Sequence, residues 1–468
     1  MPDERFAEHL AYPQGRAHSP VGAHAGAAGG AACGDLVTLS LAVEGERVTD
    51  AGFDASGCGA TIAASSAAVA LTRGRPLLDA ARIGTHEIAG ELGGLSPGKL
   101  HAAELAADAL HRALGAAARA EGATASVAGR TLVAMSGGVD SAVAALLCAR
   151  GGGDVAAVTL ELWRDPENDA EKSCCSASAV RGARALAHRM GLPHFTLDLR
   201  DEFRAGVVEP WLADHAAGLT PNPCVRCNGH VRLDAMLDFA ESLGAETLAT
   251  GHYARTTADG LLRSAADPAK DQAYMLAALA PRTIGRMRFP LGALTKPEVR
   301  AIAAEAGLPV ASKADSQDLC FLAGTGRAAF LARHGGLRDR PGDVVDRDGA
   351  PLGRHRGHHH YTVGQRRGLD IGGTPEPLYV LQTDAETNTV VAGVKAELAT
   401  SEVALKGLRL HRPPAEVDAV RLRYRSRALP CTLDGETARL GEPVDGAAPG
   451  QAAVLLRGDV VVGHATIA

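Results

Sequence analysis

The sequence of 468 residues has few aromatic side chains and no long hydrophobic run. Phe, Trp and Tyr together make up only 3%, and no apolar stretch approaches the ~20 residues that span a bilayer. Met1 to Gly15 contains acidic side chains and lacks the apolar core of a secretory signal. Hydrophobic residues at 46% and charged residues at 22% exclude wholesale disorder. We therefore expect a cytoplasmic protein of two to four domains that has no membrane partner.

Cysteine is too scarce for a disulfide scaffold of this size, and the count of nine is odd. In a cytoplasmic chain, clustered cysteines indicate catalysis or metal binding rather than disulfides. The nine are Cys33, Cys58, Cys148, Cys174, Cys175, Cys224, Cys227, Cys320 and Cys431. Cys148 and Cys431 lie in apolar patterns that favour packing roles. For the adjacent pair Cys174 and Cys175 we favour a passive role over relay of a persulfide.

Lysine is also scarce, because only seven of the 48 basic residues are Lys. We attribute the richness in Ala, Gly and Arg to genome composition.

The net charge of −6 argues weakly against a nucleic-acid partner, but this charge is unevenly distributed. Residues 1–125 hold nine basic and fourteen acidic side chains, whereas residues 320–468 hold nineteen basic and seventeen acidic ones. The C-terminal part also has the cationic patch that phosphate contacts need: Arg338, Arg340, Arg347, Arg354, Arg356, Arg366 and Arg367, with His355, His358, His359 and His360. We interpret the histidine run as RNA contact or solvated surface rather than a metal site.

Hydrophobic patterning predicts a multidomain α/β chain. Short strands at 36–41 and 48–53 precede an Ala-rich helical stretch at 60–120, which indicates an α+β domain over 1–120 with 1–32 loosely ordered. A small-residue linker is expected at 121–129. Strands and helices then alternate from 130 to 325, which is typical of βαβ units and a parallel sheet. Short strands with Gly and Pro turns follow, predicting a small linking domain at 326–375 and a β-barrel at 376–468.

A glycine-rich hexapeptide separates a predicted strand at 131–135 from a predicted helix at 139–149. In Ser136-Gly137-Gly138-Val139-Asp140-Ser141, the glycines let backbone N–H groups approach an anion, and the helix N-terminus adds a positive dipole end. Asp140 can hold Mg²⁺, and Ser136 and Ser141 can donate hydrogen bonds. The loop lacks the Gly-Lys-Ser/Thr ending of a Walker loop, which disfavours γ-phosphate chemistry. A tight turn without a ligand is the alternative.

This hexapeptide resembles the PP-loop of the adenine-nucleotide α-hydrolase superfamily. Those enzymes cleave ATP to AMP and pyrophosphate while they adenylate a substrate oxygen. The resemblance implies that ATP and Mg²⁺ bind here, at Ala134, Met135, Ser136, Gly137, Gly138, Val139, Asp140 and Ser141.

Two further segments carry three cysteines. Cys224 and Cys227 lie in Thr220–Asn228, a loop stiffened by two prolines ahead of a predicted helix, and Cys320 lies in Asp315–Phe321. A thiol near a helix N-terminus is more easily deprotonated, which favours the reactive thiolate.

From residue 130 onward the chain resembles the tRNA-specific 2-thiouridylases, the MnmA/TrmU family. Matching segments occur in family order over about 340 residues: Ser136–Ser141, Thr220–Asn228, Gly251–Arg255, Lys270–Gln272, Ser316–Phe321, Tyr361–Leu369 and Arg423–Tyr424. The family implies that ATP adenylates the 2-carbonyl oxygen of the wobble uridine, position 34 of tRNA. Cys320 then delivers sulfur as a persulfide, and Cys227 resolves it by forming a disulfide.

The same resemblance assigns binding residues. Leu160 and Gly251 would line the adenine pocket, and Leu160 replaces the Met that is usual in the family. The residues implied in contacts with the target base or tRNA are Asn222, Pro223, Cys224, His252, Lys270, Asp271, Gln272, Arg423, Tyr424 and Gln451. The partners implied are wobble-uridine tRNAs and a cysteine desulfurase or sulfur carrier.

Cys224 leaves the sulfur chemistry open, because many family members carry Asp at this position. Cys224, Cys227 and Cys320 together suit a [4Fe-4S] cluster with one open iron that binds hydrosulfide and acts as a Lewis acid. A structural zinc would need a fourth ligand, and none is obvious. The persulfide and cluster routes therefore stand as alternatives. A third alternative is that two of these thiols are buried and chemically inert.

Residues 5–115 resemble the IscU/NifU-type iron–sulfur scaffolds. The matching ligand motifs are Cys33-Gly34-Asp35, Ser56-Gly57-Cys58-Gly59 and Lys99-Leu100-His101. The scaffold family usually has a third cysteine directly after the histidine, where this chain has Ala102. Cys33, Asp35, Cys58 and His101 would still bind Zn²⁺ or a [2Fe-2S] cluster. A domain kept only for folding or dimer contacts is the alternative.

Two other functions fit the motifs less well. Another AMP-forming PP-loop ligase, of the asparagine- or GMP-synthetase type, has no use for the three cysteines. A non-catalytic iron–sulfur carrier with a decayed loop conflicts with the intact Ser136–Ser141. We expect instead a thiolase joined by a flexible linker to a scaffold-like domain that supplies sulfur or a cluster at high effective concentration.

Overall fold

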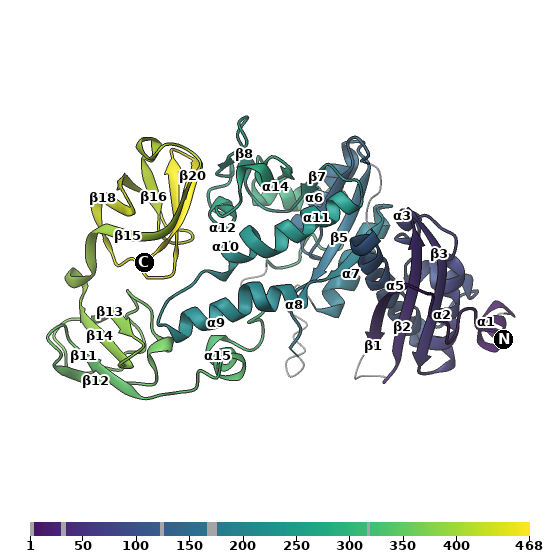
Figure 1. The fold of residues 1–468 in the computed structure, drawn as a ribbon, viewed down its shortest axis with the longest axis horizontal. Helices are drawn as coiled ribbons and strands as arrows, with labels where there is room; N and C mark the ends of the chain where they lie inside the picture. The colour runs from purple at the N-terminus through teal and green to yellow at the C-terminus, as the bar shows by residue number, and fades with distance from the viewer. Residues whose placement is uncertain (1–3, 30–33, 122–125, 166–175, 316–318) are drawn as a thin grey trace.

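The computed structural model describes residues 4–29, 34–121, 126–165, 176–315 and 319–468. In Figure 1 an N-terminal domain occupies one end, a parallel-sheet domain the middle, and a small β domain and a barrel the other end. None of the helices in the described ranges is long and apolar enough to cross a membrane.

The N-terminal domain is an antiparallel sheet of three strands backed by helices. Its strands, in spatial order, are β1 (His24–Gly29), β2 (Leu36–Glu44) and β3 (Arg47–Ser56). Alternate residues of β2 are buried, so one face of the sheet packs on the helices. These are α1 (Glu4–Ala11), α2 (Gly59–Thr72), α3 (Leu77–Ala80), α4 (Thr85–Glu91) and α5 (Leu100–Glu121). The expectation that residues 1–32 are loosely ordered is wrong for residues 4–29, because they form α1 and β1.

The central domain confirms the predicted parallel sheet. Its strand order is β10-β7-β4-β5-β6, and every pairing is parallel. The bounds are β4 (Thr131–Ala134), β5 (Val155–Glu161), β6 (His194–Asp198), β7 (Thr247–Ala249) and β10 (Met287–Arg288). The chain order reverses at β4, so the crevice between the carboxyl ends of β4 and β7 is the switch point where such sheets bind ligands.

The helices of the central domain surround this sheet and extend from it. They are α6 (Val139–Arg150), α7 (Ala177–Arg189), α8 (Arg200–Phe203), α9 (Glu209–Ala216), α10 (Pro223–Cys227), α11 (Leu233–Ser242), α12 (Ala273–Leu276), α13 (Pro281–Ile284) and α14 (Lys296–Glu305). A π-helical segment, η2 (Arg204–Val208), joins α8 to α9. After α15 (Arg327–Gly335) the chain enters its all-β part.

The all-β part consists of a small sheet and a closed barrel. The small sheet has the order β12-β11-β14-β13, with β11 (Gly342–Val345), β12 (Pro351–His355), β13 (Leu378–Asp384) and β14 (Thr389–Val394). The domain boundary predicted at 375/376 therefore falls after Val394, because β13 and β14 complete this sheet. The barrel strands are β15 (Ala399–Leu410), β16 (Ala419–Arg421), β17 (Leu429–Asp434), β18 (Thr437–Asp445), β19 (Ala452–Arg457) and β20 (Val460–Ile467), closed by pairing of β15 with β20. The hairpin β8 (Arg255–Thr256) and β9 (Leu262–Arg263) of the central domain adds to its edge.

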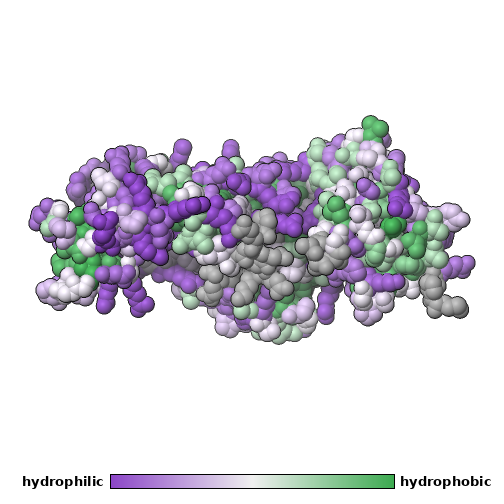
Figure 2. Space-filling model, turned by 90° about the horizontal axis from the view of Figure 1, so that it is seen from below, coloured by the Kyte–Doolittle hydropathy of each residue, from purple (hydrophilic) through white to green (hydrophobic). Residues whose placement is uncertain are grey.

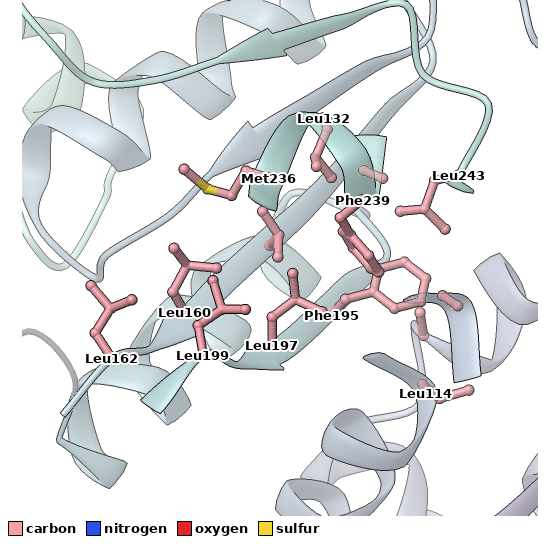
Figure 3. Close-up of a cluster of buried hydrophobic side chains, with 14 of the residues drawn as sticks. Leu114, Leu132, Leu160, Leu162, Phe195, Leu197, Leu199, Met236, Phe239 and Leu243 are labelled. Atoms are coloured by element: carbon pink, nitrogen blue, oxygen red, sulfur yellow. The ribbon is translucent and has the colours of Figure 1, made fainter. Parts of the chain in front are cut away.

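The N-terminal and central domains pack against each other and share one hydrophobic core. Leu114 of α5 packs in the same buried cluster as Phe195 of β6 and Phe239 of α11 (Figure 3). A Cβ added to Gly115 would lie 2.1 Å from the carbonyl oxygen of Thr196, so α5 and β6 approach as closely as glycine allows. Arg112 of α5 donates from Nε to Glu161 over 2.9 Å. The two domains are therefore packed against each other, and residues 122–125 of the expected linker lie outside the described ranges.

Two buried histidines, His111 and His194, and the half-buried His188 line this interface. His111 lies with its ring centroid 5.3 Å from that of His188 and 5.5 Å from that of His194. Burial lowers the pKa of His111 and His194 well below the usual value, with nearby Arg184 and the other histidines adding to the effect. Burial also lowers the pKa of His188. Burial therefore disfavours the protonated form of these rings in the folded chain.

We expect the full chain to lose stability as the pH falls from 7.5 to 5.5. In the unfolded chain these histidines bind protons near pH ~6.5, whereas in the folded chain their lowered pKa disfavours protonation. The free energy of unfolding therefore falls by roughly 1 kcal/mol per histidine for each pH unit below that value. Carboxylates with lowered pKa lose their contribution only at lower pH, which separates the two effects. Urea unfolding at the two pH values measures the difference. An unfolding free energy that is equal or larger at pH 5.5 would contradict the prediction.

The C-terminal histidine run is not a solvated surface. His355, His358 and His359 are buried, and His358 contacts the amide oxygen of Asn388 from Nδ1 over 3.1 Å. The expectation of RNA contact or solvation is therefore wrong for these three rings. Arg354 and Arg356 of the same patch remain mostly exposed, at 70% and 68% of their side-chain surface.

In the face seen in Figure 2, hydrophilic side chains dominate the upper part of the middle, and hydrophobic ones gather toward its two ends. Within the described ranges, the large hydrophobic side chains with high exposure are Leu10, Tyr12, Val21 and Leu36. All four belong to the N-terminal domain.

Candidate active site

The phosphate loop Ser136–Ser141 follows β4 and opens α6, as its sequence predicts. The hydroxyl of Ser141 ties the loop together, since it accepts from the Ser136 N–H over 3.1 Å and donates to the Gly138 carbonyl over 3.1 Å. Gly137 has φ of +70°, and a Cβ there would lie 2.9 Å from the Ala179 carbonyl oxygen of α7. Only glycine fits this turn, and its backbone N–H groups stay accessible to an anion.

Gly251 closes the other side of the crevice. It follows β7, and a Cβ there would lie 2.7 Å from the Ser141 backbone nitrogen. Two chain segments thus meet at the switch point with only backbone between them. Met135 and Leu160 are buried beside it, at the ends of β4 and β5, and Ala134 is half-buried. The predicted nucleotide residues therefore gather around one crevice.

An ion-pair network covers the phosphate loop, and the sequence reasoning did not identify it. Lys296, at the start of α14, donates from Nζ to both carboxylate oxygens of Asp140, over 2.7 and 2.8 Å. The same ammonium lies 2.9 Å from Oδ1 of Asp315. Asp140 also accepts from the hydroxyl of Tyr253 over 2.9 Å. The carboxylate predicted to hold Mg²⁺ is thus bound to a lysine in this structure.

Asp315 links this network to the Cys320 segment. Its carboxylate also contacts Lys270 Nζ at 2.7 Å and Arg300 at 3.0 Å. Burial raises the pKa of Asp315, but hydrogen bonds from Lys270 and Lys296 outweigh burial and lower it to about 2. Asp315 is therefore ionised at neutral pH, and it anchors the chain five residues before Cys320.

Lys313 reaches the phosphate loop from the same side. Its Nζ donates to the Gly137 carbonyl over 2.9 Å. With Lys270 and Lys296, it brings three of the seven lysines of the chain to one place. The signal that sequence reasoning passed over is this scarcity, because an arginine-rich chain that keeps lysine at a few positions singles those positions out.

The cysteine loop begins α10. The Asn222 side chain caps the helix and accepts from the Cys224 N–H over 3.1 Å, while Pro223 occupies the first turn. Cys227 is buried and Cys224 half-buried. Cys227 belongs to the large hydrophobic cluster against which Cys320 also packs.

Aromatic rings hold the Cys320 segment in place. Phe321 packs edge-on against Trp211, with ring centroids 5.2 Å apart, and against Phe203, at 5.9 Å. Phe203 directly precedes η2, and the Gly206 carbonyl of η2 accepts from Arg226 of α10 over 2.7 Å. The packing therefore connects α10 to the Cys320 segment through η2. Ser316, Gln317 and Asp318 lie outside the described residues.

The barrel contacts the cysteine loop directly. Gln451 donates from Nε2 to the Thr220 carbonyl over 2.7 Å, and the Thr220 N–H donates to Pro449 over 2.8 Å. Arg423 donates to Gly446 over 3.1 Å, and the Tyr424 ring lies 6.0 Å from that of Tyr274. These predicted tRNA residues thus lie on the barrel face beside α10.

The segment Lys270–Gln272 faces inward. Asp271 is buried and accepts from Arg421 of the barrel over 2.9 Å, and Gln272 accepts from the Tyr253 N–H over 2.9 Å. Lys270 bonds Asp315, as described above. Asp271 therefore joins the central domain to the barrel, while Lys270 and Gln272 bond residues within the central domain. The predicted contact of all three with tRNA stays a prediction.

His252 lies between two partners. Its Nε2 accepts from Arg232 over 3.0 Å, and its Nδ1 lies 2.8 Å from the hydroxyl of Thr250. Burial lowers the pKa of His252 to about 3, with the charge of Arg232 acting in the same direction. A neutral ring that accepts at Nε2 carries its proton on Nδ1.

A second group of candidate ligands lies in the N-terminal domain. Asp35, Cys58 and His101 each offer one atom that can bind a metal, and these three atoms lie within 4.8 Å of one another. His101 contacts the Gly98 carbonyl from Nδ1 over 3.0 Å, which turns Nε2 toward Asp35 at 3.9 Å. Thr61 donates to Asp35 and lies 3.5 Å from the Cys58 sulfur. Such outer contacts orient metal ligands, so this group fits a metal, and among the described residues it alone has this spacing.

The remaining cysteines behave as packing residues where the structure describes them. Burial raises the pKa of Cys431 to about 11, and it also raises the pKa of Cys148. The packing prediction is confirmed for buried Cys431. Cys33, Cys174 and Cys175 lie outside the described residues.

Comparison with known proteins accounts for both sites in one chain. The "Bifunctional protein NifU/MnmA" of Rubrobacter xylanophilus is 44% identical over 99% of this chain and 98% of its own length. This chain belongs to the NifU/MnmA family. The proteins named "tRNA-specific 2-thiouridylase MnmA" of Salinispora tropica and Rhizorhabdus wittichii are 46% and 44% identical over 72% and 71% of the chain, and over 99% and 90% of their own lengths.

Domain-family models divide this NifU/MnmA chain at the boundaries that the structure has. A NifU-like N-terminal domain matches residues 4–122, and the tRNA methyl transferase HUP domain matches 129–324. The tRNA methyl transferase PRC-barrel domain matches 328–394, and the aminomethyltransferase beta-barrel domain matches 404–467. The third match ends where β14 ends, which agrees with the corrected boundary.

Proposed function

We propose that the chain is an ATP-dependent tRNA 2-thiouridylase that replaces the 2-oxygen of the wobble uridine with sulfur. The observation that carries the proposal is the physical link between its two reactive parts. Lys296 binds both Asp140 of the phosphate loop and Asp315 of the segment that leads to Cys320. A nucleotide site and a sulfur site joined in this way fit a reaction that adenylates a base and then exchanges its oxygen. The names of the relatives support the same substrate and product.

The first step is adenylation. The 2-carbonyl oxygen of uridine attacks the α-phosphorus of ATP, and pyrophosphate leaves. The crevice residues fit ATP, because the Ser136–Ser141 backbone is open to phosphate oxygens and Asp140 offers carboxylate oxygens suited to Mg²⁺. The step turns a poor leaving group into AMP, which is what makes substitution at C2 feasible.

The second step transfers sulfur. The terminal sulfur of a Cys320 persulfide attacks C2 and expels AMP, which leaves the tRNA joined to Cys320 through a disulfide. The Cys227 thiolate then attacks the Cys320 sulfur, forms a Cys227–Cys320 disulfide and releases 2-thiouridine. A cysteine desulfurase or sulfur carrier supplies the persulfide, and a thiol reductant restores the two cysteines.

Cys224 supports a second route for the same transfer. Cys224 and Cys227 lie on one turn of α10, and with Cys320 they offer three thiolate ligands to a [4Fe-4S] cluster. When bound, the cluster would supply an open iron as a Lewis acid for hydrosulfide. Cys224→Ala separates the routes, since it removes a cluster ligand and spares both cysteines of the persulfide route.

The proposal is tested by incubating the full chain with unmodified tRNA, MgATP and a sulfur source. We expect 2-thiouridine at position 34 in digested tRNA and one AMP for each 2-thiouridine formed. Formation of ADP instead of AMP, or the absence of 2-thiouridine with every sulfur source, would refute it.

The N-terminal triad is proposed to bind Zn²⁺ or a [2Fe-2S] cluster, with Cys33 as the further ligand. Ala102, at the position of the scaffold family's third cysteine, is fully buried and offers no donor. We expect Cys58→Ser and His101→Ala each to remove the bound group from the full chain, which is about one equivalent of zinc or about two equivalents of iron. Metal analysis of the purified variants measures this, with His86→Ala on α4 as the control. Unchanged metal content in both ligand variants would contradict the assignment.

A further inference from the structure

Two lysines cover the phosphate loop, and one of them, Lys296, is stabilised by carboxylates that a nucleotide can replace. Lys296 is buried, with 10% of its side chain exposed, between Asp140 and Asp315. Lys313 is exposed, and its ammonium donates to the Gly137 carbonyl in the glycine turn of the loop. Two positive charges therefore lie within 3 Å of loop atoms, beside a glycine turn of the kind whose backbone N–H groups bind anions.

We propose that Lys296 and Lys313 bind the β- and γ-phosphates of ATP, and that Lys296 exchanges Asp140 for phosphate when MgATP enters. This deepens the proposed function by assigning residues to the leaving pyrophosphate, and it rests on that function. Lysine suits the role, because its ammonium is a compact point charge with three donors that can turn from one oxygen to another.

Neither carboxylate loses all of its partners when Lys296 moves to the phosphate. Asp315 keeps Lys270 and Arg300 when Lys296 turns away. Asp140 keeps the hydroxyl of Tyr253, and Mg²⁺ replaces the lost ammonium. Removing one partner of a buried ion pair is costly when the other partner stays unpaired, and here each carboxylate retains a partner. The two carboxylates thus hold Lys296 in place before the nucleotide binds.

The charges also explain how the pyrophosphate product is favoured. Negative charge develops on the leaving group as the α-phosphorus bond to it breaks. Two ammonium groups at that position stabilise the transition state, in which this charge has grown, more strongly than they stabilise bound ATP. This difference lowers the barrier to adenylation. AMP lacks the β- and γ-phosphates, so it would not contact either lysine.

The test compares binding of MgATP, magnesium pyrophosphate and AMP to the full chain by calorimetry. We expect Lys313→Met and Lys296→Met each to weaken MgATP and pyrophosphate at least tenfold and to change AMP affinity less than twofold. Lys395→Met is the matched control, because Lys395 is exposed and pairs with Asp445 of the barrel. It should leave all three affinities unchanged.

Lys313→Met decides the question if Lys296→Met fails to fold, because Lys313 is exposed and its ammonium bonds the Gly137 carbonyl rather than a buried carboxylate. Equal weakening of ATP and AMP, or no weakening of either, would overturn the assignment while leaving the thiolation proposal intact. A wild-type chain that does not bind MgATP would instead refute the proposed function itself.

Discussion

Replacement of Cys320 or Cys227 by serine is expected to lower 2-thiouridine formation by roughly a thousandfold or more, since each supplies a sulfur that no neighbour replaces. Adenylation uses the phosphate loop and not the thiols, so tRNA binding and ATP-dependent AMP formation should persist. Nucleoside mass spectrometry and AMP release measure the two steps separately.

Cys148→Ala is the matched control for this experiment. Cys148 lies half-buried on α6, which starts at the phosphate loop, and burial raises the pKa of its thiol. Its removal should leave thiolation within a factor of two. Substantial 2-thiouridine from either serine variant, or a comparable loss in Cys148→Ala, would show that the two cysteines are not the reactive pair.

Gly115→Ala is expected to destabilise the full chain by about 2–3 kcal/mol. The added methyl would lie 2.1 Å from the Thr196 carbonyl oxygen, which is a backbone atom and cannot turn aside, so α5 and β6 must move apart. Because α5 carries Leu114 and Arg112 into the shared core, the shift weakens the whole interface. Thermal unfolding should occur roughly 5 °C lower or more.

Gly182→Ala, on the neighbouring helix α7, is expected to stabilise the chain instead. Gly182 lies within α7, and no atom lies within 4 Å of an added Cβ. Alanine there gains about 0.5–1 kcal/mol, because glycine is a poor helix former. If Gly115→Ala proves as stable as the wild type, the close packing of the two domains is not as described.

The sequence alone was sufficient for the parts of the site that are local in the chain. Ser136–Ser141 is recognisable because a buried strand, a glycine turn and a helix follow one another without interruption. Cys224 and Cys227 are recognisable from their spacing and the two prolines before them. The parallel sheet was predicted from the alternation of strands and helices and is confirmed, whereas its strand order, which places the phosphate loop at a switch point, comes from the structure.

Contacts between distant segments could not be predicted in the same way. Lys296 and Asp140 are far apart in the chain, and no local pattern requires them to meet. The buried state of His358 depends on Asn388 and the Ala216 carbonyl, which belong to other elements. Residues 4–29 are rich in Ala and Gly and give little periodic signal, yet β1 is held by its pairing with β2. Tertiary packing decided each of these.

The docked N-terminal domain changes what the fusion implies. α7 lies against the phosphate loop, since the Ala179 carbonyl is 2.9 Å from a Cβ added to Gly137. The same helix contacts α5 through Arg181, which donates to Asp108 over 2.7 Å. One helix therefore touches both the nucleotide loop and the scaffold-like domain, so the two domains form a single structural unit.

The most direct test of the account follows the oxygen atom of the wobble uridine. tRNA that carries ¹⁸O at the 2-position of this uridine is incubated with the full chain, MgATP and a sulfur source, and the AMP released is analysed by mass spectrometry. If the carbonyl oxygen is adenylated and then expelled, each AMP carries one ¹⁸O atom in its phosphate. AMP without the label, alongside 2-thiouridine in the tRNA, would show that sulfur enters by another route.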